Sequence, residues 1–67
     1  MTFREAADFV MPFGKYKGKT IDEVAVTDEG LRYLDWFAGE VTKEPVRTAV
    51  ATYLADPAIS EDLSALR

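Results

Sequence analysis

Three lysines and a tyrosine in a short glycine-bounded stretch are the residues best suited to contact a ligand. Lys15, Tyr16, Lys17 and Lys19 lie in a segment, residues 9–19, that contains no acidic residue. Ammonium groups bind phosphates, and an aromatic ring offers a face on which a nucleic-acid base can stack. This basic segment (residues 9–19) is therefore the candidate nucleic-acid contact. In a purely structural alternative, the lysines keep a strand edge from aggregating and Tyr16 folds back onto the sheet.

The basic segment is followed by Thr20, so that the chain reads Gly-Lys-Thr here, as a phosphate-binding P-loop does, but the rest of that motif is missing. A P-loop has four residues between its two glycines, whereas three residues separate Gly14 from Gly18. It also joins a buried strand to a long helix, and only a short helical turn is predicted after Thr20. We therefore expect no nucleotide hydrolysis.

The composition removes the commonest catalytic and metal-binding groups. The chain has no histidine and no cysteine, hence neither the usual general base nor the usual zinc ligands. Adjacent carboxylates at positions 22–23 and 28–29 fall at predicted helix starts, where acidic side chains favour the helix dipole. We predict that the chain is not an enzyme and has no catalytic residue, metal, cofactor or small-molecule substrate.

Charge is divided unevenly along the chain. The net charge of −4 argues against a general polyanion-binding surface. The basic segment carries +3, however, while residues 1–8 carry −1 and residues 20–67 carry −6. Because salt screens exposed charges beyond about 10 Å at 0.1 M, a compact basic spot can still meet a phosphate at short range.

Trp36 and Arg32, one helical turn apart, are the candidates for contact with a partner. Trp36 falls on the border of the apolar arc of its predicted helix, so it either closes the edge of the core or serves as a stacking platform or partner anchor. Packing is the preferred interpretation, because apolar area is scarce in a small chain. Asp28, four residues before Arg32, is a sufficient ion-pair partner for it.

The element that presents the lysines is predicted to be a β-hairpin. Apolar residues alternate along positions 8–13, which is typical of a half-buried strand. Glycine at position 18 permits the positive φ that a tight hairpin loop needs. Thr20 and Glu23 then form a capping-box pattern, which predicts a short helical turn.

Two longer helices are predicted after that turn. Thr27 or Asp28 caps the first helix, and Gly39 ends it. Thr42 caps the second, in which apolar residues recur at helical spacing over residues 46–54. An Asp-Pro pair follows and ends this helix.

The predicted fold class is α+β, a small β-hairpin packed against two antiparallel α-helices with a short helical turn after the hairpin. Residues 1–67 are expected to form a single domain with an ordered core over about 8–56 and mobile termini. Thr2 and Glu5 can cap a short helix, and residues 60–66 either form one capped turn or fray. With no apolar run long enough for a membrane span and no signal-peptide pattern, we expect a cytoplasmic protein.

Three features within residues 9–54 together carry a family resemblance. They are the run Met11-Pro12-Phe13-Gly14-Lys15-Tyr16-Lys17-Gly18-Lys19-Thr20-Ile21, then Asp28 with Tyr33-Leu34-Asp35-Trp36, and a terminal amphipathic helix. With this pattern the chain resembles the C-terminal domain appended to exodeoxyribonuclease X-like proteins, which also occurs alone in bacterial and phage proteins. A related family is labelled a quorum-sensing-regulated virulence factor.

The resemblance implies a location near DNA rather than an activity. In the longer relatives the nuclease chemistry belongs to a separate domain with acidic metal ligands. An accessory role near DNA is thereby implied for Lys15, Tyr16, Lys17 and Lys19, with single-stranded DNA, DNA ends or a protein of DNA metabolism as the partner. The alternative is a protein–protein interaction module that binds through its acidic helices and Trp36, with a purely structural hairpin.

Overall fold

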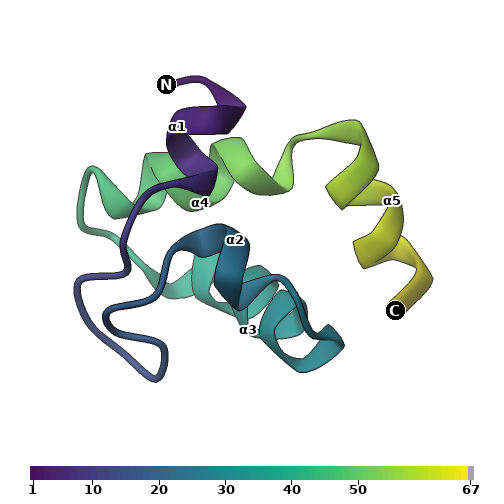
Figure 1. Ribbon diagram of the computed structural model, residues 1–67, viewed down its shortest axis with the longest axis horizontal. Coiled ribbons are helices and arrows are strands. Elements are labelled where there is room, and N and C mark those ends of the chain that lie inside the picture. Colours follow the sequence, from purple (N-terminus) through teal and green to yellow (C-terminus); the bar gives the residue numbers. More distant parts are fainter. Residues whose placement is uncertain (67) are drawn as a thin grey trace.

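Every regular element in the described part of the chain is a helix (Figure 1). The computed structural model describes residues 1–66. In chain order the helices are α1 (Phe3–Ala7), α2 (Ile21–Val24), α3 (Asp28–Glu40), α4 (Val46–Leu54) and α5 (Pro57–Leu66). Because residues 1–66 contain no β-strand, the prediction of an α+β fold built on a hairpin is wrong.

The basic segment is an irregular loop between α1 and α2. Its arms meet at a single antiparallel bridge between Val10 and Thr20, and the Met11 N–H donates to the Lys19 carbonyl at 2.8 Å. Pro12 follows and has no N–H with which to extend a ladder. The alternation of apolar residues therefore reflects the burial of Met11 in the core, where it is fully enclosed, and not the face of a sheet.

Threonine caps begin the first three helices, as the sequence predicts. Thr2 and Thr20 each accept a hydrogen bond from the backbone N–H of a glutamate three residues later, whose carboxylate accepts from the threonine N–H in return. Thr27 caps α3 by accepting from the Gly30 N–H at 3.0 Å. These caps satisfy N–H groups that lack partners in the first turn of a helix.

Two predicted boundaries of the longer helices are wrong. Gly39 does not end α3, because its backbone stays helical and the helix continues to Glu40. Thr42 does not cap α4, which begins later and has no side-chain hydrogen bond at its N-cap. Glu44 supplies a substitute, since its carboxylate accepts a hydrogen bond from the Thr48 N–H at 2.9 Å.

The core is enclosed by α1, α2, α3 and α4, with α5 against α3 and α4 (Figure 1). Its largest fully buried side chains are Tyr53, Met11, Ile21, Leu34, Val24 and Val50. The N- and C-terminal helices both contribute, through Ala6, Ala7 and Leu63, so packed side chains extend beyond the 8–56 range in which the sequence places the core. No helix within residues 1–66 is long and apolar enough to cross a membrane.

Helices α2 and α3 meet so closely at Gly30 that no side chain fits there. A Cβ atom at this position would lie 1.7 Å from the Val24 carbonyl oxygen. Across the core, the Tyr53 hydroxyl donates to the Asp22 carboxylate at 2.9 Å and ties α4 to α2. These contacts hold α2 and α3 in place, and the candidate site is built on α3 and the loop that precedes α2.

Candidate functional site

Lys15 is the one lysine of the basic segment that the structure pairs with an acid. Its Nζ lies 2.7 Å from Oε1 of Glu29, in the first turn of α3, and both side chains are largely exposed. This hydrogen bond raises the pKa of the Lys15 ammonium and lowers the pKa of the Glu29 carboxyl. Glu29 therefore serves as a counter-ion as well as a first-turn acid, and Lys15 is partly neutralised.

Lys17 and Lys19 keep their charges available to a ligand. Both are exposed, and within residues 1–66 neither ammonium group forms an ion pair or a hydrogen bond. The pKa of the nearby Glu23 carboxyl is lowered mainly by its hydrogen bonds with Thr20, and Lys19 adds a small electrostatic contribution. Gly18, with φ of 90°, turns the backbone between the two lysines.

Tyr16 folds back onto α3 instead of standing free. Its ring meets the Tyr33 ring edge-on, with centroids 4.9 Å apart, and is only partly exposed. The Lys15 ammonium lies 5.5 Å from the Tyr16 ring centroid, and the Lys15 N–H donates to the Tyr33 hydroxyl at 3.4 Å. Of the four predicted contact residues, Tyr16 is thus the most committed to packing, and its free stacking surface is small.

Trp36 and Arg32 both lie outside the core. Trp36 is 59% exposed, so the preferred interpretation of it as a closed core edge fits poorly. Its indole touches the Tyr33 ring, with centroids 5.7 Å apart. Arg32 is exposed, and the expected ion pair with Asp28 is not among those formed within residues 1–66. Tyr33 of α3 contacts the rings of both Trp36 and Tyr16 and so joins these two residues.

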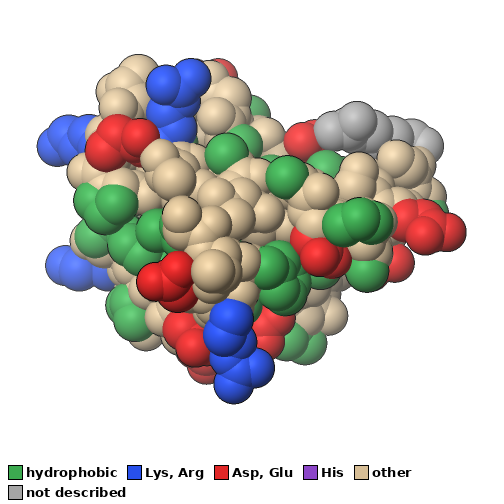
Figure 2. Space-filling view, turned by 90° about the horizontal axis from the view of Figure 1, so that it is seen from above, with side chains coloured by type: hydrophobic (Ala, Val, Ile, Leu, Met, Phe, Trp, Pro, Cys, Tyr) green, Lys and Arg blue, Asp and Glu red, His purple; other side chains and the backbone are tan. Residues whose placement is uncertain are grey.

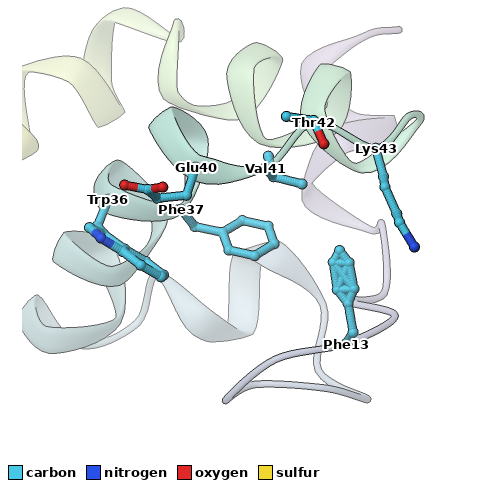
Figure 3. Close-up of a pocket in the computed structure, with 7 residues that line it drawn as sticks. All are labelled: Phe13, Trp36, Phe37, Glu40, Val41, Thr42 and Lys43. Carbon is cyan, nitrogen blue, oxygen red and sulfur yellow. The ribbon is translucent and has the colours of Figure 1, made fainter.

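A groove of about 380 Å³ opens beside Trp36 (Figure 3). Its apolar lining comes from Phe13, Trp36, Phe37 and Val41, and its polar lining from Glu40, Thr42 and Lys43. Figure 3 shows the Glu40 carboxylate near Trp36 at one end, and the Lys43 ammonium beside Phe13 at the other. The Lys43 Nζ lies 6.0 Å from the Phe13 ring centroid, close enough for a cation–π contact. We call this feature the aromatic groove.

The aromatic groove is the part of the site that sequence analysis missed. Phe13 is assigned there to a strand face, and Lys43 and Glu40 receive no role. The groove forms because Phe13, at the start of the basic segment, lies against Phe37 of α3, with ring centroids 5.8 Å apart. A faint signal was present, since Lys43 is the single base in residues 33–46.

The face that carries α1 offers no comparable gathering of cations (Figure 2). On the face that carries α1, the Lys and Arg side chains stand apart near the edges, with Asp and Glu side chains among them (Figure 2). No group of three or more potential metal ligands gathers within residues 1–66. The basic segment with the aromatic groove is therefore the strongest candidate site.

Comparison with known proteins identifies a family for the middle of the chain. Residues 11–41 match the family model of the exodeoxyribonuclease X-like C-terminal domain. No curated protein and no solved structure matches the chain. The matched segment contains the lysines of the basic segment, α2, α3 and most of the aromatic groove, whereas α1, α4 and α5 lie outside it. The resemblance drawn from the sequence is thus confirmed over residues 11–41, the part of the chain that matches this family model.

Proposed function

We propose that this chain is a non-catalytic, cytoplasmic accessory module of DNA metabolism that contacts single-stranded DNA or DNA ends through its basic segment. The observation that carries the proposal is the exposure of Lys17 and Lys19 without an acidic partner in residues 1–66. Phosphate contacts by such lysines supply affinity without reading sequence. The family match supports a nuclease-associated setting.

A non-catalytic role is supported by the use that the chain makes of its acids. Glu5 and Glu23 complete capping boxes, Glu44 bonds to Thr48, and Glu29 binds Lys15. Each of these contacts lowers the pKa of the glutamate involved, so these carboxylates remain ionised near neutral pH. A general acid needs the opposite shift, toward the working pH.

A protein-interaction module is the second candidate, favoured by one observation. Trp36 is largely exposed beside an apolar groove, and exposed tryptophans are common anchors of protein interfaces. The net charge of −4 suits a basic protein partner. In this alternative the lysines of the basic segment take no part in binding.

The two candidates separate in a titration of a short labelled single-stranded oligonucleotide with the full chain, followed by fluorescence anisotropy. We expect binding at low salt that weakens as salt rises, because cations are released from the phosphates. The double variant Lys17→Glu/Lys19→Glu should abolish binding and keep the circular dichroism spectrum of the wild type. A wild-type chain that binds no oligonucleotide at low salt would overturn the proposal and favour the protein partner.

The matched control carries the same change of charge on another surface. Arg4→Glu/Arg47→Glu alters exposed cations of α1 and α4 and changes the net charge by the same amount as the lysine pair. If the basic segment is the contact, this control should weaken binding only slightly, through the overall field. Equal losses in both double variants would show that net charge, and not the basic segment, governs binding.

A further inference from the structure

We propose that the aromatic groove is a subsite for one unstacked base of the bound single strand, with the base against Trp36 and a neighbouring phosphate at Lys43. This inference rests on the proposed function and names the chemical feature that the site selects. It concerns Trp36, Phe13, Glu40 and Lys43, of which only Trp36 is singled out by the sequence.

The shape and lining of the aromatic groove suit a flat aromatic ligand. Its walls are supplied by the rings of Trp36, Phe37 and Phe13, which come from two separate parts of the chain (Figure 3). Trp36 is 59% exposed, so an indole surface is available without any rearrangement of the core. Every base has a face that can stack on such a ring, and stacking is the main source of affinity in single-strand binding that is indifferent to sequence.

The two ends of the aromatic groove differ in charge, and a nucleotide has the matching polarity. The Lys43 ammonium at the Phe13 end suits a phosphate. The Glu40 carboxylate at the Trp36 end repels phosphate but accepts a hydrogen bond from an exocyclic amine, as glutamate does from N4 of cytosine. A strand that places its base toward Glu40 and its phosphate toward Lys43 meets both charges correctly, so we expect cytosine to be preferred to thymine.

The aromatic groove is continuous with the basic segment. Phe13 is both a wall of the groove and the residue that precedes Gly14 in that segment. On the α3 side, Tyr33 contacts the rings of both Tyr16 and Trp36. Phe13 and Tyr33 therefore connect the groove to the segment that carries Lys17 and Lys19.

The test compares oligonucleotides and variants by anisotropy with the full chain. The wild type should bind a cytosine oligonucleotide more tightly than an abasic strand of equal length and charge, by roughly 5- to 150-fold, the equivalent of one stacked base. Trp36→Ala should lose that advantage, whereas Trp36→Phe should keep part of it. Val26→Ala, at an exposed apolar side chain away from the groove, is the matched control and should change nothing.

Glu40→Gln and Lys43→Gln test the polarity of the subsite. Glu40→Gln should reduce the preference for cytosine over thymine. Lys43→Gln should weaken the binding of both oligonucleotides, and the slope of log affinity against log salt should fall by about one, the value for one phosphate contact. Equal affinity for cytosine and thymine in the wild type would contradict the role of Glu40.

The outcomes keep the inference apart from the proposed function. If Lys17→Glu/Lys19→Glu abolishes binding but the wild type binds abasic and normal strands equally, the basic segment contacts nucleic acid and the groove inference fails. If the wild type binds no strand at low salt, the proposed function fails and the inference with it. Trp36 resonances that shift with an aromatic peptide, but with no oligonucleotide, would assign the groove to a protein partner.

Discussion

The α2–α3 junction and the basic segment each depend on a glycine, but for opposite reasons. Gly30 is required by packing, because a Cβ there would strike the Val24 carbonyl at 1.7 Å. Gly18 is required by backbone conformation, with φ of 90°, and a Cβ there would meet nothing within 4 Å. Gly30 is buried in the first turn of α3, whereas Gly18 faces solvent.

This difference shows that one region of this small chain stabilises the fold while the other is exposed for binding. The junction is shaped by atoms in van der Waals contact, where one added methyl group has no space. The tip of the basic segment is held by backbone conformation and a few hydrogen bonds, so its side chains at Lys17 and Lys19 remain solvated. Substitutions in the first region should therefore act on folding, and those in the second chiefly on binding.

The largest effect is expected for Gly30→Ala. In an open helix this change stabilises by about 1 kcal/mol, but the clash with Val24 should outweigh that gain and destabilise the chain by about 3 kcal/mol or more. A domain of this size has only a few kcal/mol of stability, so the variant should be largely unfolded by circular dichroism. The matched control is Gly39→Ala in the same helix, where space is open, and it should raise the urea midpoint.

Substitution of the glycines of the basic segment should have a smaller effect. Gly14→Ala and Gly18→Ala force a side chain into positive φ, at a cost of about 1–2 kcal/mol each. Gly14→Ala should be the worse of the two, because its Cβ would also lie 2.7 Å from the Tyr33 hydroxyl. Urea unfolding would measure both. A loss for Gly18→Ala as large as that for Gly30→Ala would erase the contrast between the two regions.

Tyr53→Phe should destabilise the fold less than the glycine substitutions do. The hydroxyl donates to Asp22 at 2.9 Å, and the loss of one such bond destabilises by about 0.5–1.5 kcal/mol. Burial and the hydrogen bond to Asp22 raise the pKa of Tyr53 above its ordinary value, so the donor stays protonated in any usual buffer. Because this contact joins α4 to α2 and lies outside the basic segment, the melting temperature should fall while oligonucleotide affinity stays unchanged. A change in affinity would contradict the separation of the two regions.

The smallest effect is that of pH, which acts on the capping box of α2 and on the Lys15–Glu29 pair. The pKa of Glu23 and of Glu29 is lowered in the folded chain, so each contributes stability above its ordinary value of 4.5 and loses it as the pH falls. The pKa of Lys15 is raised above 10.5, so its contribution is complete below that value and is lost as the pH rises through the folded pKa. With no histidine, stability should be flat between about pH 6 and 9.

Thermal melts across this range check the expectation. The melting temperature should decline below about pH 4.5, since protonation weakens the capping box at the start of α2 and the Lys15–Glu29 pair. Glu23→Gln should reduce that decline more than Asp62→Asn, which alters an exposed acid of α5. A step in stability near pH 6.5 would be inconsistent with a chain that lacks histidine.

Local signals in the sequence predicted much of the helical frame. Thr2, Thr20 and Thr27 begin helices where their side chains can cap, and the apolar period over residues 46–54 gives α4. A single residue or its near neighbours decide such features. The helical content of the C-terminal residues was predicted too low, as one capped turn or a frayed end. The helix α5 depends on Asp56, which accepts a hydrogen bond from the Ala58 N–H at 3.2 Å, and on packing against α3 and α4.

The β-hairpin failed for a reason that period-2 patterns cannot reveal. Alternation shows that one side of a segment is buried, but a strand also needs a partner that continues the ladder, and here Pro12 stops it. The helix stop at Gly39 failed similarly, since glycine permits a left-handed turn without compelling one.

The candidate site was predictable only in its local part. The exposure of Lys17 and Lys19 follows from a polar, glycine-bounded turn. The pairing of Lys15 with Glu29 joins residues 14 apart in the sequence, and the aromatic groove joins Phe13 to α3 and the chain beyond it. Contacts across such separations are set by the tertiary fold, which the sequence pattern had placed in the wrong class.

The base of the basic segment is closed by three backbone hydrogen bonds, from Ile21 to Phe9, from Met11 to Lys19 and from Gly18 to Met11. These bonds close the base of the segment, while Lys15 and Tyr16 attach one side of its tip to α3 and Lys17 stays free of such contacts. Extra residues beside Lys17 would lengthen the tip without breaking the three hydrogen bonds at its base. Doubling the length of a flexible loop adds only about 0.6 kcal/mol of closure entropy. The tip is thus the place where an engineered chain should accept a foreign recognition sequence at the smallest cost in stability.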